Sequence, residues 1–228
     1  MKLTVIGASG LIGTKVVDLL TAQGHQVVAT SRSTGVDVLT GEGLADALAG
    51  ADVLIDVVNS PSFADDAVLQ FFSTSTTNLA AAAKTAGVGH YVALSIVGAD
   101  GLPDSGYMRA KVVQEKTIID SGIPYTVVRA TQFEEFSGFI IVSMLDGESV
   151  RVPDALIQPI AADDVAAEVV RVALGAPLNG SEDVGGPEKL SFADLARRVR
   201  GSLATIVVDP TAEYFGTVLE ERSLVTPD

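Results

Sequence analysis

The chain contains no cysteine among its 228 residues, and it has only two histidines, His25 and His90. Disulfides, thiol nucleophiles and cysteine-ligated metals are therefore excluded. The two histidines lie far apart in the sequence and lack the spacing of a zinc site. The acidic pairs Asp65-Asp66 and Asp163-Asp164 are better explained as helix-capping positions than as metal ligands. We expect a protein without a bound metal.

Basic residues are also scarce: Lys and Arg total 15 against 29 Asp and Glu, which gives a formal net charge of −14. Such a surface repels nucleic-acid phosphates, so no nucleic-acid partner is expected. The longest uncharged apolar stretch, Phe136 to Leu145, is too short to span a bilayer. No charged leader precedes the first apolar run. These features favour a cytoplasmic protein that has no membrane partner.

A glycine turn lies between an apolar run and a helical stretch close to the N-terminus. Leu3–Ile6 is typical of a strand, Gly7-Ala8-Ser9-Gly10-Leu11-Ile12-Gly13 follows at once, and Leu11–Ala22 has helical character. The first N–H groups of a helix are unpaired and hold phosphates. An ordinary strand–helix turn is the alternative, but the order of elements favours a dinucleotide site. Its predicted residues are Gly7, Ser9, Gly10, Leu11, Ile12 and Gly13.

Strand and helix patterns then alternate, which predicts an α/β Rossmann-type fold, a doubly wound parallel sheet. With 228 residues and 47% hydrophobic content, one domain with a sizeable core is expected. Residues 1–131 would form the nucleotide-binding core, and residues 132–228 a small C-terminal lid that is not independent. The predicted strands of the core are Leu3–Ile6, Gln26–Thr30, Val36–Leu39, Val53–Val58, Tyr91–Ile96 and Tyr125–Arg129. The predicted helices are Leu11–Ala22, Leu44–Leu48, Phe71–Ala86 and Tyr107–Ser121.

The lid region has a looser pattern. Phe133–Leu145 is compatible with a helix, and an acid of the Asp163-Asp164 pair would cap a further helix that ends near Leu174. Ser191 begins a capping box. The predicted short strands of this region are Val150–Val152, Leu156–Ile160 and Ile206–Val208.

The end of the second predicted strand bears on the cofactor. NAD-binding folds usually have an acid there, but positions 29–33 read Ala-Thr-Ser-Arg-Ser. Arg32 could face a 2′-phosphate, with Ser31 and Ser33 donating hydrogen bonds. The alternative is a solvated loop arginine, and Asp37 could still reach the adenine side. We predict NADP(H) in preference to NAD(H).

Tyr107 and Lys111 share one face of a predicted helix because they are four residues apart. A lysine there can lower the pKa of the tyrosine and bind ribose hydroxyls, and the tyrosine can then give a proton to a carbonyl that receives hydride. Ser95, at the end of the preceding strand, could polarise the same oxygen. The alternative is an unremarkable tyrosine beside a surface lysine.

Together these motifs resemble the short-chain dehydrogenase/reductase superfamily, in particular its atypical NmrA-like NAD(P)-binding branch. The resemblance covers nearly the whole chain. It rests on residues 7–13, 53–59, 92–98, 107–111, 122–129, 158–166 and 185–188. It implies that Val57, Val58 and Asn59 line the cofactor, that Lys111 holds the nicotinamide ribose, and that Ala130, Thr131 and Phe133 flank the nicotinamide.

The leading interpretation is a reductase that uses NADPH and a small carbonyl or quinone-type acceptor, with Tyr107, Lys111 and Ser95 as catalytic residues. The superfamily's asparagine is absent near Ser73, and Asn78 one turn later is explained by packing. A non-catalytic NADP(H)-sensing regulator is therefore the alternative. A nucleotide-sugar epimerase is disfavoured by the short C-terminal region. A homodimer is compatible with the sequence.

The phenylalanines of the lid region have two interpretations. Phe133, Phe136 and Phe139, together with Met144, could line an apolar substrate pocket. Equally, Phe133, Phe136 and Ile140 fit the buried face of a helix.

Overall fold

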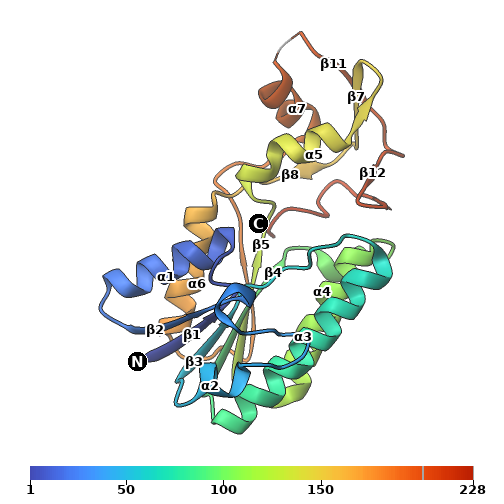
Figure 1. The fold of residues 1–228 in the computed structure, drawn as a ribbon. Helices are drawn as coiled ribbons and strands as arrows, with labels where there is room; N and C mark the ends of the chain where they lie inside the picture. Colours follow the sequence, from blue (N-terminus) through green and yellow to red (C-terminus); the bar gives the residue numbers. More distant parts are fainter. Residues whose placement is uncertain (202, 228) are drawn as a thin grey trace.

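The computed structural model describes residues 1–201 and 203–227. Its centre is a six-stranded sheet in the order β2-β1-β3-β4-β5-β9, in which every neighbouring pair is parallel (Figure 1). The strands are β1 (Lys2–Ile6), β2 (Gln26–Thr30), β3 (Val53–Asp56), β4 (His90–Ile96), β5 (Tyr125–Ala130) and β9 (Gly180–Val184). The predicted α/β Rossmann-type class is confirmed.

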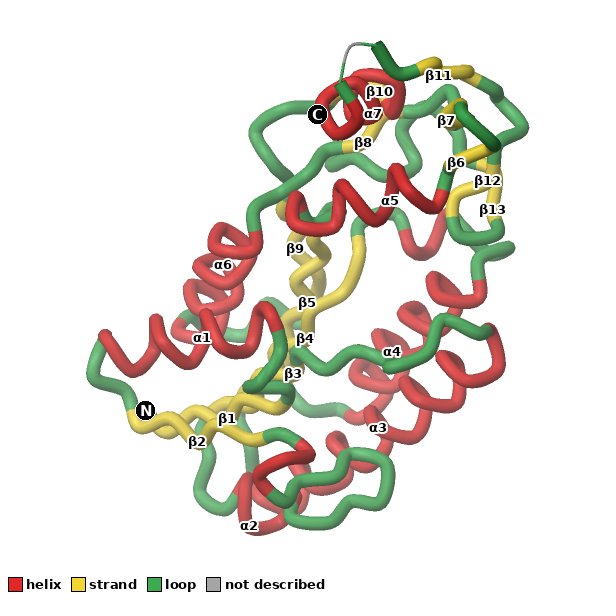
Figure 2. The backbone as a smooth tube through the Cα atoms, turned by 45° about the horizontal axis from the view of Figure 1, so that its top comes forward, coloured by secondary structure: helices red, strands yellow, loops and turns green. Residues whose placement is uncertain are grey.

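Helices cover both faces of this sheet, as both views show (Figures 1 and 2). On one face lie α1 (Leu11–Ala22) and α6 (Ala162–Leu174). On the other lie α2 (Leu44–Leu48), α3 (Asp65–Ala86) and α4 (Gly106–Ser121). All four residues of β3 are buried, because a parallel strand covered on both faces has no side open to water. The two faces of the sheet thus bury separate apolar clusters.

The chain leaves the sheet twice beyond β5. These two excursions build an upper apolar cluster above the carboxyl ends of the strands, separate from the two clusters that flank the sheet (Figure 2). The first excursion contains the short helices η3 (Glu134–Phe136) and α5 (Ser137–Ser143) and the strands β6 (Leu145–Asp146), β7 (Ser149–Val152) and β8 (Leu156–Ile157). The chain then returns to form α6 and β9. The second excursion contains β10 (Leu190–Ser191), α7 (Phe192–Arg200), β11 (Thr205–Val208), β12 (Glu213–Tyr214) and β13 (Thr217–Val218). Residues 132–228 therefore contribute both to the sheet layer and to the part above it.

The predicted strand Val36–Leu39 is wrong, because this segment is a loop and turn. The Asp37 carboxylate accepts hydrogen bonds from the backbone N–H groups of Leu39 (2.8 Å) and Thr40 (3.4 Å). Asn78 donates to the carbonyls of Val38 (2.9 Å) and Leu39 (3.0 Å). These side chains satisfy backbone groups that a sheet ladder would otherwise pair. Asn78 therefore caps backbone carbonyls of this loop by hydrogen bonds.

Other boundaries differ in ways that have local causes. Helix α3 begins at Asp65 rather than Phe71, and the predicted helix over 133–145 is divided into η3 and α5. Asp163 and Asp164 lie in the first turn of α6 rather than at its N-cap. The first free N–H of that helix, on Ala162, instead donates to the Glu135 carboxylate at 3.0 Å. Ser191 does cap α7, as predicted, and accepts from the Asp194 N–H at 3.1 Å.

The strand β9 was not predicted, because its sequence Gly-Ser-Glu-Asp-Val lacks apolar character. It lies at the edge of the sheet, where one side of the strand meets solvent and a polar sequence is tolerated.

The turn between β1 and α1 depends on two glycines. Gly7 has a φ of +90°, a left-handed conformation that other residues rarely adopt. A Cβ atom on Gly13 would lie 2.1 Å from the Gly7 carbonyl oxygen. Any side chain at position 13 would therefore push the helix away from the strand.

Gly13→Ala should lower the free energy of unfolding by roughly 1–3 kcal/mol, because backbone atoms must move to admit the methyl group. Gly138→Ala is the matched control, since Gly138 is an exposed helical glycine with nothing within 4 Å of its added Cβ. That control should be neutral or stabilising by up to about 1 kcal/mol. Urea unfolding of the two variants measures the difference, and equal stabilities would contradict the close-approach argument.

Candidate functional site

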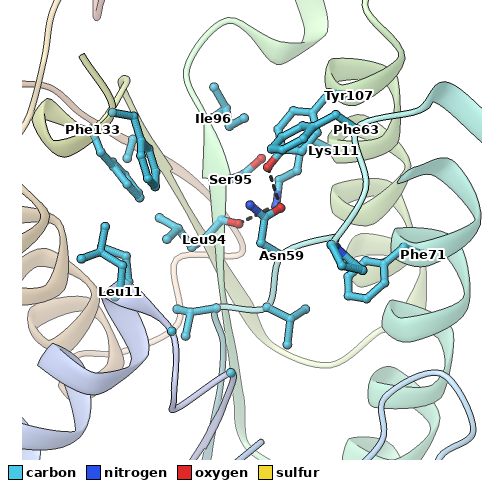
Figure 3. Close-up of a pocket in the computed structure, with 18 of the residues that line it drawn as sticks. Leu11, Asn59, Phe63, Phe71, Leu94, Ser95, Ile96, Tyr107, Lys111 and Phe133 are labelled. Carbon is cyan, nitrogen blue, oxygen red and sulfur yellow. Dashed lines mark hydrogen bonds between the residues drawn. The ribbon is translucent and has the colours of Figure 1, made fainter. Parts of the chain in front are cut away.

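A cavity of about 840 Å³ opens at the carboxyl ends of the central strands (Figure 3). It runs from the glycine turn and the end of β2, past the ends of β3, β4 and β5, to residues of the C-terminal segment. In parallel α/β sheets, ligands bind at this end. All predicted site residues line the cavity except Gly13 and Ser33. Gly13 acts through packing against the turn, and the Ser33 hydroxyl lies 2.8 Å from that of Ser31.

The phosphate end of the cavity is formed by the exposed loop Ser9–Leu11 at the start of α1. No side chain caps this helix. Its first N–H groups and the positive end of the helix dipole are therefore available to an anion. The geometry suits the pyrophosphate of a dinucleotide.

The end of β2 carries a single cation. The Arg32 guanidinium lies 3.4 Å from the Asp37 carboxylate and is 74% exposed. The backbone N–H of Leu39 is the main reason that the pKa of Asp37 is lowered, with Arg32 as a smaller cause. Asp37 thus holds Arg32 at the cavity edge, where its remaining donors are free to meet a ligand.

Tyr107 lies at the start of α4 and is directed at Asn59, the residue expected to line the cofactor. Its hydroxyl donates to Asn59 Oδ1 at 2.7 Å (Figure 3). The same oxygen accepts the N–H of Ser60 at 2.9 Å, which fixes the orientation of the amide. Burial raises the pKa of Tyr107 to about 12. Burial is the larger cause, and the hydrogen bond to Asn59 acts in the opposite direction. Lys111 does not contribute to this shift in the pKa of Tyr107, so its predicted effect stays a prediction.

Lys111 is held below Tyr107 by a buried polar network. Its ammonium donates to the Leu94 carbonyl at 2.8 Å and to Gln114 Oε1. Gln114 Nε2 in turn donates to Asp56 Oδ2 at 3.1 Å. The ammonium also lies 4.4 Å from the centre of the Phe72 ring, a cation–π distance. Lys111 is only 3% exposed, and this burial lowers its pKa to about 8.

The counter-charge of this network is Asp56, at the end of β3 and 1% exposed. Its carboxylate accepts from the Tyr91 hydroxyl at 3.0 Å and from the Val58 N–H at 3.2 Å. Burial nevertheless raises the pKa of Asp56. The network is satisfied at nearly every atom, which is the condition for holding a charged side chain inside a protein.

Ser95 lines the cavity, but its hydroxyl proton is engaged elsewhere. It donates to Glu115 Oε1 at 2.6 Å, and Glu115 also accepts two hydrogen bonds from Arg129, at 3.0 and 2.6 Å. To polarise a substrate oxygen by donation, Ser95 would have to leave Glu115.

Several lining residues were not predicted. Gln132 follows β5, is 9% exposed, and its Oε1 atom has no hydrogen-bond partner within residues 1–201 and 203–227. This oxygen is enclosed by the protein, so a ligand could reach it only if neighbouring groups moved. Its position between the predicted Thr131 and Phe133 was the signal available in the sequence.

The aromatic side of the cavity was predicted in part. Phe133, Phe136 and Phe139 line it, whereas Met144 lies in the upper apolar cluster above the strand ends. Phe63, Tyr214 and Phe215 also line it. Tyr214 and Phe215 come from the last part of the chain, where no periodic pattern predicts that they line a cavity.

The NAD(P)H-binding family profile matches residues 7–174, well over half of the chain. The chain belongs to the NAD(P)H-binding family. The resemblance to the atypical short-chain dehydrogenase/reductase superfamily is confirmed, and the cofactor type is NAD(P)H. Within residues 1–201 and 203–227, no helix is long and apolar enough to cross a bilayer.

A curated relative of this chain is the photosystem II assembly factor Ycf39 of Synechocystis sp. It is 27% identical over 165 residues, which cover 66% of this chain and 51% of the relative. The chain thus spans about half the length of the curated relatives it matches.

Solved structures share the fold over nearly the whole chain. An NADPH-dependent quinone oxidoreductase from Escherichia coli, complexed with NADPH, has a TM-score of 0.72 at 23% identity, covering 91% of this chain and 77% of that one. A triphenylmethane reductase from Citrobacter sp., complexed with NADP(H), has a TM-score of 0.71 at 20% identity, covering 93% and 80%. These likenesses show that the chain has the same Rossmann-type fold.

The cavity of this chain fits such a cofactor. The helix that follows the glycine turn has no side-chain cap that would compete with a pyrophosphate, and Arg32 after β2 and residues 130–133 after β5 line the same cavity as the turn. The volume is within the range of ordinary ligand sites. Lys111 and Asn59 are polar groups of the same lining.

The buried Lys111 should make stability depend on pH. Between its folded pKa of about 8 and its usual value of about 10.4, the unfolded chain holds a proton that the folded chain has released. Stability should therefore rise with pH over this interval. Lys111→Met should flatten the rise between pH 7.5 and 9.5, measured by urea unfolding.

Lys116→Met, on the same helix but with a side chain 72% exposed, should leave the rise in place. A wild-type slope that persists in Lys111→Met would contradict the assignment.

Proposed function

We propose that this protein is an NADPH-dependent oxidoreductase that transfers hydride to a small carbonyl or quinone-type acceptor. One observation carries the proposal: the Tyr107 hydroxyl and the buried Lys111 lie in the same cavity as the glycine turn. The similar structures named as a quinone oxidoreductase and a triphenylmethane reductase support it at the level of fold.

The chemistry divides between cofactor and protein. Bound NADPH supplies a hydride, so that the acceptor gains two electrons and the cofactor becomes NADP⁺. Tyr107 supplies the proton to the acceptor oxygen, which yields an alcohol or a hydroquinone. With a pKa raised to about 12, the phenol is protonated at neutral pH, the state an acid requires. Solvent returns a proton to Tyr107 afterwards.

Lys111 serves as the ribose anchor in this proposal. Its charge is balanced by Asp56 through Gln114, so the ammonium is held in one place before the cofactor arrives. Such preorganisation lowers the cost of binding and orientation. Asn59 fixes the direction of the Tyr107 hydroxyl.

The second candidate is an NADP(H)-sensing regulator without turnover. The observation that favours it is the Ser95 hydroxyl, whose proton is engaged by Glu115. There is no asparagine near Ser73, and the Tyr107 hydroxyl, which also donates within the protein, would have to leave Asn59 Oδ1 to reach an acceptor. The experiment on Tyr107 below separates the two candidates.

Arg32→Ala should weaken NADPH binding by about tenfold while changing NADH binding little, because an exposed charge-assisted contact to the 2′-phosphate is lost. Titration calorimetry with both cofactors measures the change. Equal losses for the two cofactors would remove Arg32 as the source of preference.

Tyr107→Phe should lower kcat for quinone reduction by 10²-fold or more, the usual effect of losing a general acid. NADPH affinity should stay within a few-fold of wild type. The consumption of NADPH is followed by its absorbance with quinone, aldehyde and ketone acceptors. Tyr125→Phe, at the other end of the sheet, is the matched control and should keep full activity.

Unchanged turnover in Tyr107→Phe would remove the tyrosine from the mechanism. Tight NADPH binding with no turnover on any acceptor would overturn the reductase in favour of the sensor.

A further inference from the structure

The cavity has few charged lining residues, and the one beside Tyr107 on α4, Lys111, is buried. Among the described lining residues only Arg32, Asp37 and Lys111 carry charge. The first two pair with each other at the end of β2, and Lys111 is buried in its own network. The remaining part of the cavity, toward the C-terminal segment, therefore offers no cation to a phosphate or carboxylate on the acceptor.

Two phenylalanines meet at this end from opposite sides. Phe63 belongs to the loop after β3, and Phe215 lies at the tip of the β12–β13 hairpin. Their ring centres are 6.1 Å apart with planes inclined by 30°. Both rings stay partly open to solvent, at 52% and 39% exposure. They form one apolar surface that spans the two parts of the molecule.

Phe215 lies at the cavity with an unfavourable backbone conformation. Tyr214 pairs with Thr217, so Phe215 and Gly216 form a two-residue turn with φ values of +45° and +78°. Turns of this kind favour Asn or Gly, so a bulky residue there is strained. The Phe215 ring packs edge-on against Tyr214, with 4.7 Å between the ring centres, and it also lines the cavity, where a ligand would meet it.

The same surface reaches the proton donor. The centre of the Phe63 ring lies 5.5 Å from that of Tyr107, with the ring planes inclined by 40°, and Figure 3 shows the two side chains as neighbours. A planar ligand stacked on Phe63 would therefore lie beside Tyr107.

We propose that the acceptor is a planar, uncharged aromatic ring compound of the naphthoquinone kind, stacked on the surface formed by Phe63 and Phe215. This inference rests on the proposed function and names its substrate class. It excludes nucleotide sugars and other anionic acceptors, which would find no cation at this end and would be repelled by a net charge of −14.

The preference for uncharged acceptors is tested with a charged and an uncharged acceptor that share the same ring. The wild-type protein should reduce 1,4-naphthoquinone with a kcat/KM at least tenfold above that for 1,4-naphthoquinone-2-sulfonate. The sulfonate withdraws electrons and makes its ring easier to reduce, so a lower rate can only reflect binding. Equal or faster reduction of the sulfonate would overturn the preference for uncharged acceptors.

Stacking of the acceptor on Phe215 is tested with a substitution that the turn conformation accommodates. Phe215→Asn removes the ring while placing a favoured residue at the positive φ, so the variant should be at least as stable as wild type. Its kcat/KM for 1,4-naphthoquinone should fall by about five- to tenfold, the scale of one aromatic contact. Val218→Thr, an exposed position in the same hairpin outside the cavity lining, should leave kcat/KM unchanged.

Binding without turnover separates this inference from the function on which it rests. Calorimetry with 1,4-naphthoquinone and the NADP⁺-loaded protein measures affinity when no hydride is present. Weaker binding in Phe215→Asn supports the stacking surface even if no acceptor is reduced. Unchanged affinity and unchanged kcat/KM in that variant would overturn it while leaving the reductase intact.

Discussion

The close approach of Gly13 to the Gly7 carbonyl is the constraint from which the rest of the site follows. Because a Cβ atom at position 13 would overlap that carbonyl, only glycine allows α1 to start directly above the end of β1. The first N–H groups of the helix then face the same edge of the sheet at which all parallel strands end. The phosphate end, the ribose end and the acceptor end of the cavity thus open along one line.

Lys111 illustrates how a charge is kept inside such a protein. Burial alone disfavours the ammonium, as its lowered pKa indicates. The Leu94 carbonyl, Gln114 and Asp56 compensate with hydrogen bonds and an opposite charge. The arrangement holds Lys111 in one place before any ligand binds. Tyr107 is protonated at neutral pH because its own burial raises its pKa.

The sequence was sufficient for the parts of this fold that depend on local patterns. Continuous apolar runs predicted β1 and β3, and the order of strand, glycine turn and helix predicted the cofactor end. It failed where side chains from distant segments decide the structure. Val36–Leu39 has the pattern of a strand, but Asn78 and Asp37 satisfy its backbone groups and hold it as a loop. Likewise, Tyr107 and Lys111 could be placed on one helix face, whereas the Asp56–Gln114 network that determines the Lys111 environment comes from three separate elements.

The distribution of charge explains how a strongly acidic protein can bind an anionic dinucleotide. Affinity for the phosphates does not require a basic surface, because backbone N–H groups at the start of α1 and one guanidinium, Arg32, act at short range. At longer range the net charge of −14 repels anions, and it repels a multiply charged dinucleotide more than a singly charged acceptor. A dinucleotide can offset this repulsion with many contacts along the cavity, whereas in the proposed site a small anionic acceptor would meet the aromatic rings of Phe63 and Phe215. If the proposal holds, the same charge pattern admits the cofactor and selects against charged acceptors.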